Sequence, residues 1–206
     1  MSKVFVDVGL SLDGYLAGPN RGPGNPLGDG GPSIHGWLFE TATFRDMLGL
    51  PAPARQSPDD DLVREVFRRA GAYVMGRRMF DEGEVSWPEN PPFRAPVFVL
   101  TNVARAPWPR PGGTTFHFVT DGIASALGQA KAAANGKDVR ISGGAETIRQ
   151  YLQAALIDEM TLHVAPMLLG DGLRLFDTLK PSDLKLAQQG VRSSPLTTHI
   201  TYQIRQ

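Results

Sequence analysis

The sequence predicts an α/β fold, in which an open sheet carries a ligand crevice along the carboxyl ends of its strands. The prediction rests on three strand-like segments that each end in glycine or polar residues. These segments, with the residues that follow them, are 138–141 with Gly143 and Gly144, 72–75 with Gly76, and 97–100 with Thr101 and Asn102. Because open α/β sheets bind ligands where their strands end, we expect these residues to meet at one site.

Gly143 and Gly144 connect the first of these strands to a predicted helix over 146–155, whose approach includes Ala145 and Glu146. Glycine leaves the backbone bare, and the free N–H groups of a helix N-terminus attract anions. The Gly-Gly turn therefore suits a phosphate. Glycine pairs also make ordinary tight turns, and this alternative stays open.

Arg77 and Arg78 follow Gly76 at the start of a second predicted helix. A guanidinium can bind two phosphate oxygens at once. The positive end of the helix dipole is otherwise an unfavourable place for a cation. The arginine pair is therefore easier to understand if an anion sits between the two side chains, although a solvated pair is the simpler alternative.

Thr101 and Asn102 end the third strand. Their side chains can hydrogen-bond a sugar or a phosphate, or they can simply start a turn. The position of these residues, at the same kind of strand end as the two glycine turns, favours the ligand.

Composition narrows the class of protein. The chain has 206 residues, which suits a single α/β domain over residues 1–206, and its 21 basic and 21 acidic residues balance. No overall charge draws it to nucleic acid or to a membrane surface, so any affinity for anions must be local. It has no cysteine, which excludes thiol catalysis and disulfides. We find no signal peptide or membrane-spanning run and expect a cytoplasmic protein.

The remaining pattern adds strands, helices and a long loop. The acidic run after Ser57 reads as a helix start rather than a metal cluster, since serine caps and acids favour the helix dipole. We expect strands over 4–12, 116–119 and 159–165, helices over 35–48 and from 122 to about 135, and a terminal hairpin of 184–191 and 197–204. The glycine- and proline-rich loop at 18–32 is either a mobile connector or a lid over a ligand crevice.

Several segments resemble known reductases. Residues 74–80 and 141–144 resemble the Met-Gly-Arg and Gly-Gly segments of dihydrofolate reductases. Residues 11–17, and 156–162 followed by 166–172, are more similar to the reductase domain of the riboflavin-biosynthesis deaminase-reductase. The resemblance covers nearly the whole chain. It implies a stand-alone domain of dihydrofolate-reductase-like fold, with a mixed, mostly parallel sheet, flanking helices and a C-terminal antiparallel hairpin.

The resemblance also implies an NADPH-dependent reductase and favours the lid for the loop at 18–32. Val8 and Gly9 would touch the nicotinamide amide, and Arg77 would be the main partner of the 2′-phosphate. The other implied cofactor-binding residues are Gly76, Arg78, Thr101, Asn102, Gly143, Gly144, Ala145 and Glu146. The substrate would be a small heteroaromatic or carbonyl-bearing molecule.

Catalytic residues are harder to place, because hydride transfer needs little beyond positioning, desolvation and sometimes one proton donor. An acid on the first helix holds the pterin in dihydrofolate reductases, which makes Glu40 a candidate, with a solvated helix acid as the alternative. Asp13 matches the Ser-Leu-Asp-Gly pattern beside the nicotinamide in riboflavin-type reductases, but it could also be a turn-forming residue. His163 alternates with strand neighbours and can face the cleft. None of the histidines has metal-ligand spacing.

The sequence departs from dihydrofolate reductases in two places. Met79 stands where they usually have a phosphate-binding threonine, and the loop before the first helix is longer and richer in glycine. No pterin pocket is recognisable either. A true dihydrofolate or pterin reductase is therefore an alternative function, and a non-catalytic nucleotide-binding protein is another. Riboflavin-type reductases commonly pair, and the alternating C-terminal hairpin offers an edge strand. We therefore expect a homodimer.

Overall fold

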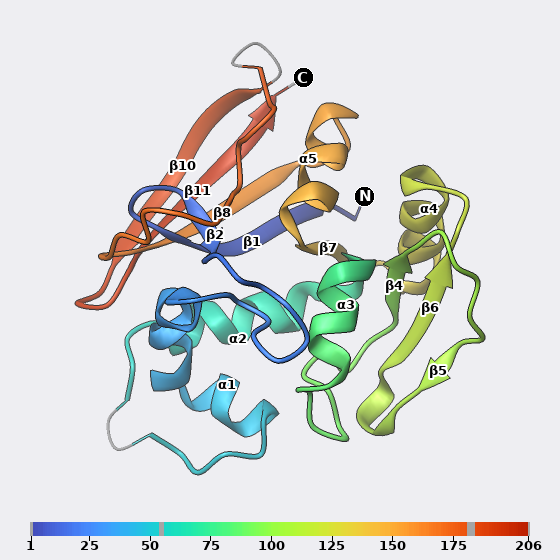
Figure 1. The fold of residues 1–206 in the computed structure, drawn as a ribbon, viewed down its shortest axis with the longest axis horizontal. Coiled ribbons are helices and arrows are strands. Elements are labelled where there is room, and N and C mark those ends of the chain that lie inside the picture. Colours follow the sequence, from blue (N-terminus) through green and yellow to red (C-terminus); the bar gives the residue numbers. More distant parts are fainter. Residues whose placement is uncertain (1, 54–55, 181–183, 206) are drawn as a thin grey trace.

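A computed structural model describes residues 2–53, 56–180 and 184–205 of the chain. These residues form a central nine-stranded sheet with the strand order β10-β11-β8-β1-β7-β3-β4-β6-β5 (Figure 1). The strands are β1 (Val4–Ser11), β3 (Ala70–Gly76), β4 (Val97–Leu100), β5 (Trp108–Pro109), β6 (Thr115–Val119), β7 (Asp138–Gly143), β8 (Glu159–Ala165), β10 (Lys185–Ser193) and β11 (Thr198–Arg205). The α/β class expected from the sequence is confirmed.

The sheet is mostly parallel. β8, β1, β7, β3, β4 and β6 pair in parallel, whereas β5, β11 and β10 run antiparallel to their neighbours. The expected C-terminal hairpin is present as β10 and β11, and it places β10 at one edge of the sheet. The six parallel strands therefore end at one edge.

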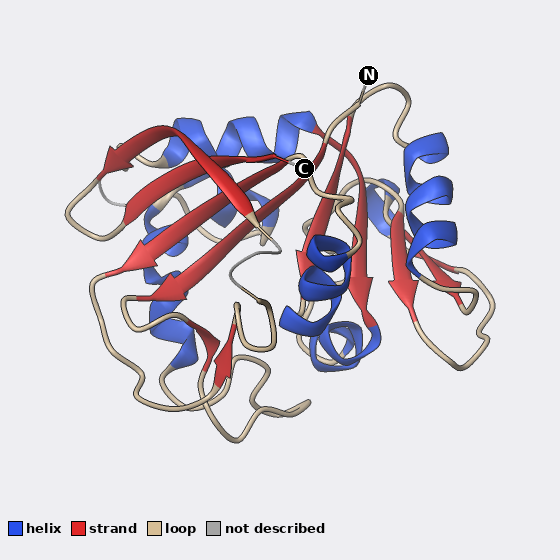
Figure 2. Ribbon diagram, turned by 90° about the horizontal axis from the view of Figure 1, so that it is seen from above, coloured by secondary structure: helices blue, strands red, loops and turns tan. Residues whose placement is uncertain are grey.

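Helices cover both faces of the sheet (Figure 2). They are η1 (Gly31–Glu40), α1 (Ala42–Met47), α2 (Asp60–Arg69), α3 (Arg77–Glu84), η2 (Pro111–Gly113), α4 (Ile123–Ala133) and α5 (Ala145–Gln153), where η marks a 3-10 helix. A small second sheet pairs β2 (Tyr15–Ala17) with β9 (Leu173–Arg174). None of the helices in the described ranges is long and apolar enough to cross a membrane.

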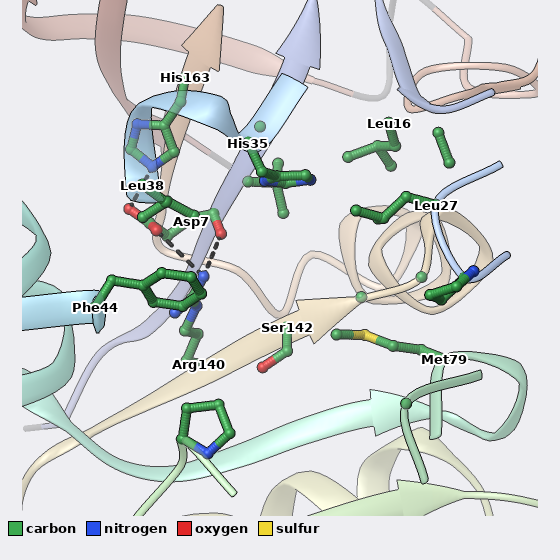
Figure 3. Close-up of a pocket in the computed structure, with 18 of the residues that line it drawn as sticks. Asp7, Leu16, Leu27, His35, Leu38, Phe44, Met79, Arg140, Ser142 and His163 are labelled. Carbon is green, nitrogen blue, oxygen red and sulfur yellow. Dashed lines mark hydrogen bonds and ion pairs between the residues drawn. The ribbon is translucent and has the colours of Figure 1, made fainter. Parts of the chain in front are cut away.

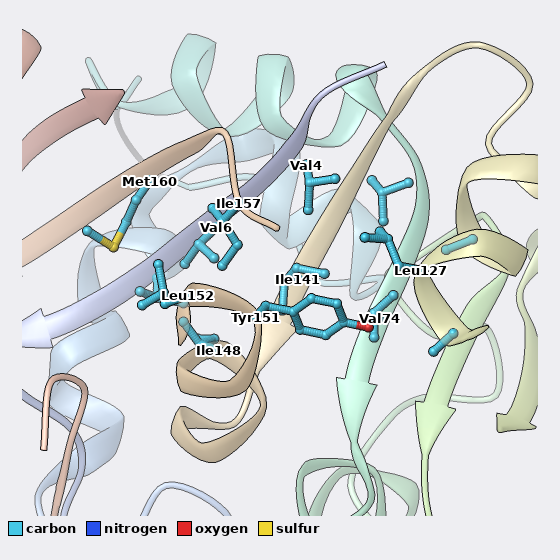
Figure 4. Close-up of a cluster of buried hydrophobic side chains, with 14 of the residues drawn as sticks. Val4, Val6, Val74, Leu127, Ile141, Ile148, Tyr151, Leu152, Ile157 and Met160 are labelled. Carbon is cyan, nitrogen blue, oxygen red and sulfur yellow. The ribbon is translucent and has the colours of Figure 1, made fainter. Parts of the chain in front are cut away.

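Side-chain alternation along the strands separates two apolar clusters. Val74 of β3 and Ile141 of β7 pack with α4 and α5 on one face (Figure 4). Tyr73 of β3 packs with α2 and α3 on the other. Each fully buried residue such as Ile141 contributes roughly 2 kcal/mol through removal of apolar surface from water. The same alternation directs Asp7, which shares the parity of Phe5, toward the face with α2 and α3.

The prediction of one continuous helix over 35–48 is wrong. The chain forms η1 and then α1, with Thr41 between them in an extended conformation at φ −94° and ψ 137°. The hydroxyl of Thr41 donates a hydrogen bond to the carbonyl of Leu38 at 2.6 Å. A threonine side chain that bonds the local backbone competes with helix continuation, which explains the break.

The loop at 18–32 is closely tied to itself and to α3. The Gly18 amide donates to the Leu27 carbonyl, and the Asp29 amide donates to the Pro19 carbonyl, each at 2.9 Å. The Arg21 guanidinium lies 2.7 Å from the Glu82 carboxylate, and both side chains are largely buried. The loop is therefore anchored beside the carboxyl edge of the sheet.

Candidate active site

Three helix N-termini surround one cavity at the carboxyl edge. α3, α4 and α5 begin after Gly76, Gly122 and Gly144, and none of these N-caps supplies a side-chain hydrogen bond. All three glycines line a cavity of about 750 Å³. Because the first N–H groups of a helix lack intrahelical partners, this arrangement presents several donors and the positive ends of three dipoles to one space.

This cleft contains most of the residues that the sequence predicts for cofactor binding. Those in its lining are Gly76, Arg77, Arg78, Thr101, Asn102, Gly144, Ala145 and Glu146. Sequence reasoning missed Thr120 and Gly122, which also line it. The sequence predicts only a helix start there, although its strand–glycine–helix pattern matches the other two turns.

The two arginines each form an ion pair with an acidic residue of their own helix. The Arg77 guanidinium lies 2.6 Å from Asp81, and that of Arg78 lies 3.2 Å from Glu82. A second nitrogen of Arg77 donates to the Thr101 hydroxyl at 3.4 Å. Helix α3 therefore compensates its own N-terminal cations, and an anion in the cleft would compete with Asp81 for Arg77.

The structural reason for glycine differs between the two predicted turns. A Cβ atom at Gly76 would come within 2.4 Å of the Thr147 hydroxyl, so glycine there permits close packing between β3 and α5. A Cβ atom at Gly144 would meet no protein atom within 4 Å. The space over Gly144 belongs to the cleft, and this bare backbone fits the pyrophosphate of a dinucleotide.

A second cavity, of about 450 Å³, adjoins the cleft (Figure 3). The two share five lining residues: Arg21, Met79, Gly144, Ala145 and Leu173. The predicted residues Val8, Gly9 and Gly143 line this second cavity. Its walls are otherwise mainly apolar and aromatic, with side chains from η1, α1, α2, α3 and the loop at 18–32. An elongated ligand can therefore extend from the cleft into an apolar chamber.

Asp7 and Arg140 form one of two charged pairs among the described residues that line the apolar chamber, and Arg21 with Glu82 forms the other. A terminal nitrogen of Arg140 donates to the Asp7 backbone carbonyl at 2.7 Å and lies 3.2 Å from its carboxylate (Figure 3). Burial alone raises the pKa of Asp7, but the nearby His163 and Arg140 outweigh it and hold the pKa at about 2. Asp7 is therefore a carboxylate at neutral pH.

Six buried polar atoms on residues that line the chamber have no hydrogen-bond partner among the described residues. They are the Tyr73 and Ser142 hydroxyls, Nε of Arg21, Nε of Arg140, Nε1 of Trp37 and Nε2 of His163. Buried polar groups normally find partners, since each unsatisfied group costs about 1–3 kcal/mol. Burial also raises the pKa of Tyr73 to about 12, so its hydroxyl keeps its proton. Of these six atoms, the Tyr73 and Ser142 hydroxyls are candidates to bind the polar groups of a ligand.

A chain of four side chains leads away from the chamber. Nε2 of His163 lies 3.0 Å from the Asp7 carboxylate, although the ring is not aligned for a regular hydrogen bond. Nδ1 of His163 lies 2.7 Å from Nδ1 of His199, and Nε2 of His199 lies 3.2 Å from the Asp59 carboxylate. All four residues are buried. Among the described residues, no group of acids and histidines is arranged to hold a metal ion.

Two aromatic neighbours complete this region. The Trp37 ring lies 4.8 Å from the His163 ring and 4.9 Å from the His199 ring, measured between centroids. His35 of η1 borders the chamber, and burial lowers its pKa to about 4, with the charges of His163 and Arg140 adding to the effect. His35 is therefore neutral at neutral pH.

The structure places neither predicted catalytic acid in the lining of either cavity. The Asp13 carboxylate accepts hydrogen bonds from the Ser11 hydroxyl and from the Leu169 and Gly170 amides, at 2.6, 3.1 and 2.8 Å. The carboxylate therefore joins the turn after β1 to the distant segment at 169–170. Glu40 is the exposed last residue of η1. A catalytic role for either acid stays a prediction.

Sequence reasoning missed Asp7 and Arg140, and it noted His163 only as a residue that can face the cleft. A signal for Asp7 was present, because an acid inside an otherwise apolar central strand is rarely buried without a partner. That partner comes from β7, and the histidine from β8. Only the strand order brings the three side chains together.

The fold and the adjoining cavities define an α/β protein of the dihydrofolate-reductase-like class. More specifically, the chain belongs to the RibD C-terminal domain family, whose model matches residues 2–200. It is 33% identical over 203 residues to the protein YyaP of Bacillus subtilis (strain 168), covering 93% of this chain and 90% of that protein.

Two solved structures illustrate the relationship. The chain is similar to a putative riboflavin biosynthesis protein from Shewanella sp. PV-4, with a TM-score of 0.67, 25% identity and 99% of both chains covered. It also shares its fold with dihydrofolate reductase from Enterococcus faecalis complexed with NADP(H), with a TM-score of 0.53 and 13% identity, covering 99% of this chain and 97% of that one. The expected family and fold are confirmed.

Proposed function

We propose that this protein is an NADPH-dependent reductase of a small heteroaromatic or carbonyl-bearing molecule. The observation that carries the proposal is the junction of two cavities at Gly144 and Ala145. One cavity offers uncapped helix N-termini to phosphates, and the other is apolar and contains a few polar groups. This division suits a dinucleotide whose phosphates occupy the first cavity and whose redox-active ring reaches the second.

The residues of the cleft fit such a cofactor. The N–H groups of α5 and the open space over Gly144 would hold the pyrophosphate, while Thr101 and Asn102 would contact the adenosine side. Arg77 would bind the 2′-phosphate, exchanging part of its contact with Asp81 for the ligand. When bound, NADPH supplies the hydride. The related fold of a reductase complexed with NADP(H) supports this choice of cofactor.

The apolar chamber indicates the substrate class. Asp7 and Arg140 compensate each other, and His35 is neutral, so the chamber offers no uncompensated charge from these groups to a highly charged substrate. The Tyr73 and Ser142 hydroxyls can bind a ring nitrogen or a carbonyl oxygen. A flat, uncharged molecule with one polar edge fits these contacts.

Two other functions make different predictions. A true dihydrofolate or pterin reductase would reduce a pterin in preference to other heteroaromatic or carbonyl compounds. A non-catalytic nucleotide-binding protein would bind the cofactor without reducing anything. The polar atoms of Tyr73 and Ser142 beside the cofactor cleft favour a second ligand, and therefore an enzyme.

Binding and turnover can be measured on the same preparation. We expect purified protein to enhance NADPH fluorescence on titration, and to oxidise NADPH in the presence of members of a panel of flat heteroaromatic ketones, quinones, aldehydes and pterins. Turnover confined to pterins would favour the first alternative, and binding without turnover of the whole panel would favour the second. The absence of NADPH binding would contradict the proposal.

A further inference from the structure

We propose that Arg21, in the loop at 18–32, binds the pyrophosphate of the cofactor together with the N-terminus of α5. The inference rests on the proposed reductase function and deepens it, because it adds a loop residue to the cofactor site. The pyrophosphate of a dinucleotide is doubly charged, whereas a helix N-terminus is equivalent to only about half a positive charge. The N–H groups of α5 therefore leave much of the charge for a side chain to balance.

Arg21 lies where the two cavities meet. Five of the described residues line both cavities, and the other four are Met79, Gly144, Ala145 and Leu173. Arg21 is the one positively charged residue in this set of five. Gly144 is the N-cap of α5 and Ala145 is its first residue. Arg21 therefore shares the junction with the N–H groups that would receive the pyrophosphate.

The guanidinium of Arg21 retains a donor for a ligand. Its Nη2 atom donates to the Glu82 carboxylate at 2.7 Å. Nε and Nη1 form no hydrogen bond with a described residue, and Nη1, unlike Nε, is not buried. A guanidinium can bind two oxygen groups through different nitrogens. Arg21 can therefore bind a phosphate oxygen through Nη1 while it keeps its contact with Glu82.

The charges around Arg21 do not balance. The Glu82 side chain is 5% exposed and also lies 3.2 Å from Nε of Arg78, which lines the cofactor cleft. A terminal nitrogen of Arg78 donates to the Arg21 backbone carbonyl at 3.4 Å. Two guanidiniums therefore share one carboxylate, and the group of three residues has one positive charge in excess. An anion at the junction would balance that charge in a partly desolvated place, where pairing matters most.

The loop backbone holds Arg21 in this position before any ligand binds. Asn20 has a left-handed φ of 58°, and the Gly22 and Asn25 backbones exchange two hydrogen bonds, at 3.1 and 2.8 Å. The Asn20 and Asn25 side chains both donate to the Asp29 carboxylate, at 2.7 and 2.8 Å. A residue that is already ordered loses little conformational freedom on binding, which favours affinity.

Arg21→Ala tests the contact. We expect it to lower the affinities for NADPH and NADH by the same factor, about 10- to 100-fold, because both cofactors contain the pyrophosphate and a charged hydrogen bond is lost. Arg174→Ala is the matched control, since Arg174 follows the junction residue Leu173 but lines neither cavity, and we expect a change below about twofold there.

Three outcomes of these titrations overturn the proposal. They are an unchanged cofactor affinity in folded Arg21→Ala, an equal loss in Arg174→Ala, and a loss confined to NADPH, which would place Arg21 at the 2′-phosphate. A raised KM for the substrate with unchanged cofactor affinity would assign Arg21 to the substrate and also overturns it.

Glu82→Gln distinguishes direct binding from anchoring of the loop. It breaks the same ion pair as Arg21→Ala, so a purely structural role of the pair predicts that both substitutions weaken cofactor binding. Direct binding predicts that Glu82→Gln binds NADPH at least as tightly as the wild type, because the amide oxygen still accepts from Nη2 and the competing negative charge is gone. A loss in Glu82→Gln equal to that in Arg21→Ala overturns direct binding.

The double variant Arg21→Ala/Glu82→Gln excludes an indirect effect of charge. If Arg21 acted only by neutralising Glu82, removal of both charges would restore the affinity for NADPH. Direct binding requires that the loss caused by Arg21→Ala persists, because the donor is still missing. Recovery of wild-type affinity in the double variant overturns the proposal.

Inorganic pyrophosphate separates this inference from the proposed function, since it has no nicotinamide. We expect the protein to bind it, as followed by phosphorus nuclear magnetic resonance, and Arg21→Ala to weaken the binding about tenfold. Arg21-dependent binding of pyrophosphate without binding of NADPH would support the contact and contradict the reductase. Binding of NADPH and pyrophosphate that is unchanged in Arg21→Ala would overturn the contact and leave the reductase standing. Binding of neither would overturn both.

Discussion

A terminal nitrogen of Arg140 contacts both the backbone carbonyl and the carboxylate of Asp7, at 2.7 and 3.2 Å. The two residues are 133 positions apart in the chain and lie on the paired parallel strands β1 and β7. This double contact brings a buried charge pair to the wall of an apolar chamber. Its energetic importance can be measured separately from any activity.

Asp7→Asn is expected to lower the free energy of unfolding by about 3 kcal/mol, because it leaves the Arg140 cation buried without its counter-charge. Urea denaturation at neutral pH measures this. Lys3→Gln is the matched control, since the Lys3–Glu159 pair is 3.4 Å long and the lysine is 59% exposed. We expect less than about 0.5 kcal/mol there. Equal effects of the two substitutions would contradict the role of burial.

Stability should depend on pH through His35. Its pKa is about 4 in the folded protein, against an ordinary value of 6.5. Between these values the unfolded chain binds a proton that the folded protein does not, so stability is complete above pH 6.5 and falls as the pH drops toward 4. We expect a loss of about 2 kcal/mol, reduced from the full pKa difference because His35 is only half-buried. His35→Gln should flatten this part of the profile, and an unchanged slope in that variant would refute the assignment.

Cofactor preference follows from Arg77. We predict that NADPH binds at least about tenfold more tightly than NADH, a difference of about 1.4 kcal/mol, because the arginine can pair with the 2′-phosphate. Arg77→Ala should weaken NADPH and leave NADH nearly unchanged. Arg105→Ala is a control, since that arginine lies outside the cleft and pairs with Glu84. Equal affinities of the wild type for both cofactors in a fluorescence titration would rule the preference out.

Gly144→Ala separates ligand contact from turn geometry. Its φ is −68°, and a methyl group would meet no protein atom, so the variant should fold with a melting temperature close to that of the wild type. It should lose NADPH affinity, because the methyl group enters the space for the phosphates. Gly143→Ala is the matched contrast: its φ is +134°, which favours glycine, and we expect a lower melting temperature. A Gly144→Ala variant that binds NADPH normally would argue against the phosphate position.

Self-association is predicted to involve β10. This strand lies at the edge of the sheet and exposes Leu186 and Val191, with 43% and 52% of their surfaces accessible. An open edge offers unpaired backbone groups to a partner. Light scattering should give about twice the chain mass of 22.3 kDa. Val191→Lys should weaken the dimer, whereas the control Val85→Lys, at the C-cap of α3 and 66% exposed, should not. A monomer in the wild type would contradict the prediction.

The local pattern of the sequence predicts most of the long strands and helices, but not the short strands β2, β5 and β9. Apolar runs and the turns after them indicated the parallel strands, and β4 and β8 have the expected limits. Most cofactor-cleft residues were also accessible, because a strand–glycine–helix turn is a local signal. The break at Thr41 was not, since a single side-chain hydrogen bond interrupts an otherwise helical pattern.

The sequence alone determined the α/β class, the reductase resemblance and most of the residues at the strand ends that line the cleft. Each of these depends on residues close together in the chain. Only the tertiary structure decided which polar groups line the apolar chamber and that His199 lies behind them. Asp7, Arg140, His163 and His199 come from four strands, and their contacts depend on strand order and register. The parity of each side chain on its strand then directs all four to the same face of the sheet.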